Sequence, residues 1–185
     1  MSATLTGPTI IDDKQATFAL EVWKTAIGVQ EHFNTIEMQI RNFAISVLTA
    51  TIGAAGLVYN QLQENIRGAI KANLPIPLAN TIHVLGLDFS SADMIIIAGM
   101  AGWFAFWFMD LGWYHRLLRG AVKHAENIEN RIKNTQYGDL MLLTNTISIT
   151  SHFKFLGIDM GSNRRIILFY VIGLLLQLIL IFFVF

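Results

Sequence analysis

An uncharged apolar run, Phe43 to Tyr59, constrains this chain more than any other feature. It lies inside the segment Arg41 to Gln61, RNFAISVLTATIGAAGLVYNQ, which contains no proline. At a rise of about 1.5 Å per residue, the run nearly crosses the hydrocarbon core of a bilayer. Because hydrocarbon offers no hydrogen-bond partners to the backbone, such a segment predicts a membrane-spanning helix.

One face of this predicted helix differs from the others. Small and polar residues recur there at alternating spacings of four and three, which place them on a single stripe: Asn42, Ser46, Thr49, Gly53, Gly56 and Asn60. Two interpretations stay open. The stripe is a packing seam for another helix, as in small-xxx-small motifs, or it lines a pore in an oligomer.

The composition agrees with an integral membrane protein. Of the 185 residues, 54% are hydrophobic and only 14% are charged, and the mean hydropathy is +0.50. The chain has no cysteine, which excludes disulfides, thiolate zinc sites and cysteine nucleophiles. No phosphate-binding, hydrolase or zinc-protease motif is present, so we expect no catalytic residue, no metal ligand and no cofactor.

The apolar and polar segments alternate along the chain. We expect an N-terminal arm (1–13), a cytoplasmic amphipathic helix (14–41), transmembrane helix 1 (42–61), an external connector (62–93), transmembrane helix 2 (94–113), a cytoplasmic helix (114–134), a cytoplasmic loop or hairpin (135–165) and transmembrane helix 3 (166–185). The predicted fold class is an all-α integral membrane protein with three transmembrane helices. Two of these extend into the cytoplasm as long amphipathic helices, and one cytoplasmic segment contains β structure.

The β structure is expected in the loop at 135–165. There Ile147, Ile149, Phe153 and Phe155 alternate with polar residues, a period of two that predicts a strand or a short hairpin.

The basic residues predict the orientation. The connector carries only Arg67 and Lys71, whereas eight basic residues lie between Arg116 and Arg165. The positive-inside rule therefore places that stretch, and the N-terminal helix with it, in the cytoplasm. We expect a multi-pass membrane protein with a cytoplasmic N-terminus, inserted by its own spans because residues 1–14 show no signal-peptide pattern.

Two groups of charged residues are candidates for function. A basic set outside the predicted spans suits an anionic ligand, although positive-inside topology and a solvated helix face are the alternatives: Arg119, Lys123, Arg131, Lys133 and Lys154. Asp110, at the end of the second apolar run, is either a titrating group or, as we favour, a partner of Arg116 or His115.

Two segments, EVWKTAIGVQEHFNTIEMQIRNFAISVLTATIGAAG and DLGWYHRLLRGAVKHAENIE, resemble small membrane effectors of bacterial anti-phage operons. The resemblance is to the Hailong type, encoded beside a nucleotidyltransferase, with SLATT-type effectors as a near alternative. It implies an oligomeric ion channel of the bacterial inner membrane that depolarises the infected cell. Because a chain of this size is too small to enclose a conduit alone, a channel requires a homo-oligomer, with a tetramer as the candidate stoichiometry. It also implies control by a nucleic-acid oligomer or nucleotide signal made by the partner enzyme.

A second function stays open from the residues. In this alternative the chain is a non-conducting membrane adaptor or anchor that docks a soluble partner through its cytoplasmic helices. The stripe on the first span discriminates between the two, since it lines an axis in a channel and is buried against another helix in an adaptor.

Overall fold

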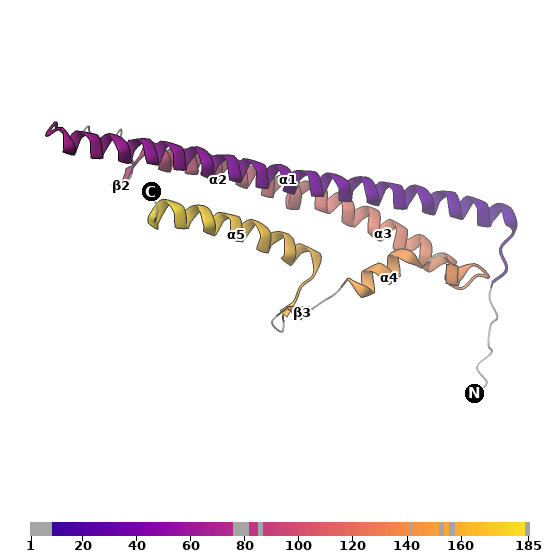
Figure 1. Ribbon diagram of the computed structural model, residues 1–185. Helices are drawn as coiled ribbons and strands as arrows, with labels where there is room; N and C mark the ends of the chain where they lie inside the picture. Colours follow the sequence, from indigo (N-terminus) through magenta and orange to yellow (C-terminus); the bar gives the residue numbers. More distant parts are fainter. Residues whose placement is uncertain are drawn as a thin grey trace. The chain divides into compact units, whose positions relative to one another are not determined.

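A computed structural model of the chain describes residues 9–75, 82–84, 87–140, 142–151, 154–155 and 158–183. Helices dominate it (Figure 1): α1 (Asp13–Lys71), α2 (Ser91–Trp107), α3 (His115–Ile132), α4 (Leu143–Thr150) and α5 (Ser162–Phe183). A π-helical segment, η1 (Phe108–Tyr114), joins α2 to α3, and η2 (Gly138–Leu140) is a 3₁₀ turn. Two short antiparallel strand pairs complete it: β1 (Ile82–Val84) with β2 (Leu87–Phe89), and β3 (Lys154–Phe155) with β4 (Ile158–Asp159).

Three helical stretches are long and apolar enough to cross a membrane. They are α1, the stretch from Ser91 to Ile132 that runs through η1, and Ser162–Phe182 of α5. The first two contain the predicted spans 42–61 and 94–113, and the third covers the predicted span 166–185 up to Phe182, so the predicted number of span-length apolar helices is confirmed.

The chain divides into two compact units. Unit 1 comprises Met1–Met38 and Leu111–Arg165, and unit 2 comprises Gln39–Asp110 and Ile166–Phe185. All the long apolar runs predicted as spans fall in unit 2, except for a few residues at their ends. Unit 1 holds the amphipathic halves of the first two helical stretches together with α4.

The first helix ends later than the sequence predicted, at a defined capping motif. Asn73 adopts a left-handed conformation, with φ of 51°. Its N–H donates to Ile70 O at 3.3 Å, and the N–H of Leu74 donates to Ala69 O at 3.0 Å. These two bonds form a Schellman motif, in which asparagine is the usual substitute for glycine. The polar segment after the predicted span therefore stays helical up to Lys71.

The predicted strand in the loop at 135–165 is wrong in its first half. Ile147 and Ile149 lie in α4, which begins where two of its backbone N–H groups bind the buried carboxylate of Glu129. This long-range cap stabilises a helical turn that the local pattern does not signal. The predicted hairpin is present further along as β3 and β4, which includes Phe155, whereas Phe153 lies outside the described residues.

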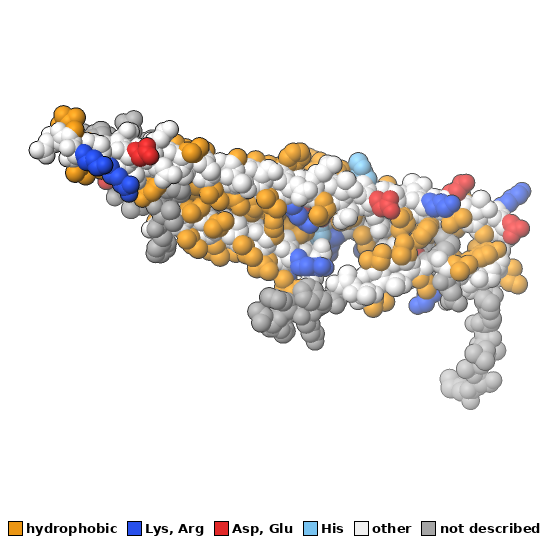
Figure 2. All heavy atoms as spheres, in the orientation of Figure 1, with side chains coloured by type: hydrophobic (Ala, Val, Ile, Leu, Met, Phe, Trp, Pro, Cys, Tyr) orange, Lys and Arg blue, Asp and Glu red, His pale blue; other side chains and the backbone are white. Residues whose placement is uncertain are grey.

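Unit 2 packs α1, α2 and α5 through small residues and one tryptophan. Ala55, Ala92 and Ile96 form its buried core. Trp103 of α2 donates from Nε1 to the backbone oxygen of Tyr170 in α5 at 2.8 Å. Its ring lies against Gly173, where an added methyl group would collide with it. Figure 2 shows hydrophobic side chains over the visible face of α2 and α5, as expected for helices that face lipid.

Candidate functional site

Within unit 2, no described residue covers most of the polar stripe of α1. Five of its residues are exposed and one is half-buried: Asn42, Ser46, Thr49, Gly53 and Asn60, and the half-buried Gly56. The hydroxyls of Ser46 and Thr49 donate to the oxygens of Asn42 and Ile45, both at 2.9 Å. A Cβ built on either stripe glycine meets no neighbouring described atom within 4 Å. The stripe is therefore open to its surroundings.

A different face of α1 makes the contacts inside unit 2. Ala44 and Ala55 are fully buried. Thr51 approaches Gly99 of α2 so closely that a methyl group at Gly99 would collide with its side chain. Packing among the described residues of unit 2 thus uses the face of Ala44, Thr51 and Ala55 and leaves most of the polar stripe uncovered.

The spacing of the stripe continues along α1 beyond the apolar run. Exposed small or polar residues occupy each next position toward the N-terminus: Gln39, Thr35, His32, Gly28 and Thr25. Alternation of four and three averages 3.5 residues per turn, slightly below the 3.6 of an α-helix. A stripe with this period stays on a common axis when several helices wind around each other with a left-handed supercoil.

The π-helical segment presents a buried carboxylate to the other helices of unit 2. Asp110 is fully buried. Arg41 of α1 donates to it from Nε at 2.7 Å and from Nη2 at 3.1 Å, one bond to each oxygen. The hydroxyl of Tyr170 in α5 donates to Oδ2 at 3.2 Å. Together, the bidentate pair and the bond from Tyr170 link α1, η1 and α5.

The sequence predicted Arg116 or His115 as the partner of Asp110, and this prediction is wrong. Arg116 is exposed. His115 is buried in unit 1, with Nδ1 at 3.0 Å from Oε1 of Glu37. The true partner lies 69 positions before Asp110, too far for any local spacing to reveal it. A π-helical turn also rotates the side chains that follow it away from their α-helical positions.

A second buried carboxylate, which sequence reasoning missed, organises unit 1. Glu129 is fully buried and accepts four hydrogen bonds. The backbone N–H groups of Thr144 and Asn145 donate at 2.7 and 2.8 Å, the Asn145 amide at 3.0 Å and Trp23 Nε1 at 3.0 Å. Burial raises the pKa of Glu129, but these hydrogen bonds outweigh it, so its pKa lies below the ordinary value.

Part of the predicted basic set meets in one groove of unit 1. The groove, about 760 Å³ in volume, is lined mainly by α3, α4 and the start of α5, with Gln30 of α1 at its wall. Arg119 and Lys123 line it together with Arg164, which the sequence analysis did not include, and Glu126 adds one opposite charge. The N–H groups of Arg164 and Arg165 bond to Gly161 O as α5 begins.

The remaining members of the predicted set do not line this groove. Arg131 and Lys133 are exposed, near the C-terminal end of α3. Lys154 lies in β3, and its side chain is outside the described residues. In the described part of the chain, no group of three His, Asp or Glu side chains is placed to hold a metal ion.

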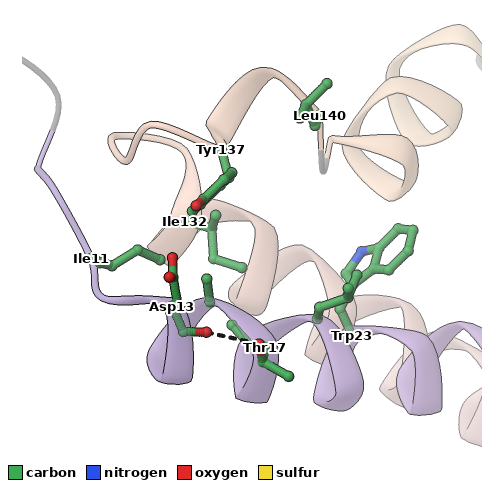
Figure 3. Close-up of a pocket in the computed structure, with 10 residues that line it drawn as sticks. Ile11, Asp13, Thr17, Trp23, Ile132, Tyr137 and Leu140 are labelled. Atoms are coloured by element: carbon green, nitrogen blue, oxygen red, sulfur yellow. Dashed lines mark hydrogen bonds between the residues drawn. The ribbon is translucent and has the colours of Figure 1, made fainter.

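A more apolar hollow lies where α1 begins (Figure 3). Its volume is about 430 Å³. Trp23, Ile132 and Tyr137 line it, and the hydroxyl of Thr17 at its edge donates to Asp13 O at 2.7 Å. Leu140, which also lines the hollow, is 80% exposed, so unit 1 presents apolar surface at this end.

Comparisons of the chain with protein-family models, curated proteins and solved structures found no match.

Proposed function

We propose that this chain is the subunit of a homo-oligomeric, ligand-controlled ion channel in the bacterial cell membrane, where it acts as a depolarising anti-phage effector. The observation that carries the proposal is the uncovered polar stripe on the apolar part of α1. Its candidate pore-lining residues are those of the predicted stripe: Asn42, Ser46, Thr49, Gly53, Gly56 and Asn60.

The physical argument concerns what surrounds the stripe. In lipid, polar groups are placed against protein or water, because hydrocarbon satisfies neither their hydration nor their hydrogen bonds. Inside unit 2, α1 makes its contacts through a different face, where Ala44 and Ala55 are buried. The surroundings of the stripe therefore come from other subunits, and a ring of α1 helices, for example in a tetramer, turns the stripes toward a shared axis.

The side chains of the stripe predict the character of the conduit. Ser46 and Thr49 satisfy their hydroxyl hydrogens on the helix's own backbone and leave oxygen lone pairs for water. The stripe carries no charge between Asn42 and Asn60. Without a charged ring, neither cations nor anions are rejected, so we expect weak ion selectivity, with Thr49 near the narrowest part.

Single-channel recording in planar bilayers tests the proposal. Thr49→Leu and Ser46→Leu place a larger apolar group on the axis and should lower the conductance while the oligomer stays intact. Ala50→Leu is the matched control, because Ala50 is an exposed alanine beside the stripe. It adds similar bulk toward lipid and should conduct like the parent.

Two results would count against the pore. One is parental conductance in Thr49→Leu and Ser46→Leu, with normal oligomers by native mass spectrometry. The other is failure of the parent to collapse the membrane potential of expressing cells, followed with a potential-sensitive dye.

The proposed control follows the resemblance to effectors encoded beside a nucleotidyltransferase. A nucleic-acid oligomer or nucleotide is the proposed signal, and the basic set on and near α3 is the proposed contact surface: Arg119, Lys123, Arg131, Lys133 and Lys154. Adding short oligonucleotides to the recording chamber tests whether the current responds. Electrostatic binding of this kind weakens as salt concentration rises.

The apolar hollow of unit 1 favours the adaptor as the second candidate function. Leu140 lines the hollow. Phe18 lies in the stretch of α1 that also lines it and is 69% exposed. Exposed apolar side chains of this kind suit a docked protein surface. If Phe18→Ser and Leu140→Ser abolish the cellular effect while the parent carries no current, the adaptor replaces the channel.

A further inference from the structure

The groove lined by α3, α4 and the first turn of α5 combines positive charge with apolar surface. Among the described residues that line it, Arg119, Lys123 and Arg164 are cationic and Glu126 is anionic. The apolar part of the lining comprises Leu118, Val122 and Ile147. A lining of both kinds suits an amphiphile that carries a negative charge.

A buried histidine gives independent support for a ligand here. His115 lines the groove and is only 3% exposed. Glu37 contacts its Nδ1 at 3.0 Å. Its other ring nitrogen, Nε2, is buried and has no hydrogen-bond partner among the described residues. Because buried polar atoms in folded proteins are nearly always paired, this atom calls for a partner beyond the described residues, and a ligand in the groove is one candidate.

The position of the groove on the chain narrows the ligand class. Gly161, Ser162 and Asn163 line it, so it lies at the N-terminal end of α5, one of the three helices apolar enough to cross a membrane. If α5 spans the bilayer, its first turn lies at the level of the lipid headgroups. Helix N-termini also favour phosphate through their unpaired N–H groups and dipole.

We propose that this groove binds the phosphate group of an anionic phospholipid, with Arg119, Lys123 and Arg164 as its cationic contacts. Of the basic set proposed above to contact a nucleotide signal, Arg131, Lys133 and Lys154 then remain for that signal, because they are not among the described residues that line the groove. The inference rests on the proposed membrane insertion of α5, but not on conduction. A soluble phosphate or phosphodiester carries the same charge but has no acyl chain to contact Leu118 and Ile147. The lipid therefore fits the lining better.

The test is lipid retention by the full-length protein, measured by native mass spectrometry after release from nanodiscs of phosphatidylglycerol and phosphatidylcholine. The parent should retain phosphatidylglycerol in preference. Arg119→Gln with Lys123→Gln should weaken this retention about thirtyfold, since each basic residue near a bilayer surface contributes roughly 1 kcal/mol. Lys14→Gln with Lys24→Gln removes equal charge from exposed positions of α1 in unit 1, outside the groove, and should retain lipid like the parent.

Competition with soluble probes separates the two sources of phosphate. Inorganic phosphate and a short oligonucleotide are added at equal phosphate concentration. Displacement of phosphatidylglycerol by either probe, equal losses in both double variants, or no lipid preference in the parent would each overturn the lipid assignment. Because the assay measures no current, its failure leaves the channel proposal standing, and a non-conducting protein can still retain the lipid.

Discussion

At the scale of single residues, two buried carboxylates connect helices that are far apart in sequence. Asp110 joins α1, η1 and α5 in unit 2, and Glu129 joins α1, α3 and α4 in unit 1. Each carboxylate accepts its bonds from donors that match its geometry, which repays part of the cost of burying a charge. Removing a partner should therefore matter more than removing a surface charge.

Glu129→Gln should destabilise α4 by about 1.5–3 kcal/mol at neutral pH, the usual range for hydrogen bonds to a charged group. Glutamine keeps the shape but turns an NH₂ group toward the donors of Asn145 or Thr144. Because the folded pKa lies below the ordinary 4.5, the stabilisation is complete above pH 4.5 and is lost as the pH falls through the lowered folded value. The parent and the variant should thus converge in acid.

Hydrogen exchange at the amides of Thr144 and Asn145 measures this effect. Glu31→Gln serves as the control because Glu31 is an exposed acid on α1, and it should exchange like the parent. Equal protection in Glu129→Gln and the parent at pH 7 would show that the carboxylate does not hold α4.

Arg41→Gln should cost about 3–5 kcal/mol of stability, because it leaves a fully buried carboxylate without its cation. Asp110→Asn should cost less, since the Arg41 side chain is 23% exposed and can turn toward water. Arg116→Gln, at an exposed position, should be neutral. Thermal unfolding in detergent ranks the three variants. An unfolding temperature of Arg41→Gln equal to that of the parent would show that the Arg41–Asp110 pair does not stabilise the fold.

At the scale of elements, the helices that consist of continuous apolar runs were predicted from the sequence. The three span-length helices follow from stretches such as Phe43 to Tyr59, where uninterrupted hydrophobicity and helical spacing agree. The polar stripe was likewise visible from spacing alone, and the structure adds that another face of α1, with Ala44 and Ala55, makes the contacts inside the chain.

Elements that depend on long-range contacts could not be predicted in this way. The segment with Ile147 and Ile149 alternates like a strand but forms α4, because Glu129 caps its first turn from another helix. The groove needs Arg164 beside Arg119 and Lys123, and no sequence spacing signals that the start of α5 reaches α3. The helix and the groove both depend on contacts between residues far apart in sequence, which local patterns do not reveal.

At the scale of the whole molecule, insertion of all three candidate spans would put residues before the first span and residues after the third on opposite sides of the membrane. The basic residues then decide which side is which. Eight of them fall between Arg116 and Arg165, whereas the connector after α1 carries only Arg67 and Lys71. The positive-inside rule therefore predicts that α3, α4 and the N-terminal half of α1 lie in the cytoplasm.

Cysteine labelling measures this topology cleanly, because the chain has no cysteine of its own and the parent gives no background. Leu74→Cys, an exposed position just after α1, should react with a membrane-impermeant maleimide in intact spheroplasts. Glu21→Cys and Lys133→Cys, both exposed, should react only after the membrane is opened, since each lies in a segment assigned to the cytoplasm. The reverse pattern would invert the orientation and move the basic groove outside the cell. Labelling of all three positions from outside would mean that α1 does not span the membrane, and the pore assigned to its stripe would then have no bilayer to cross.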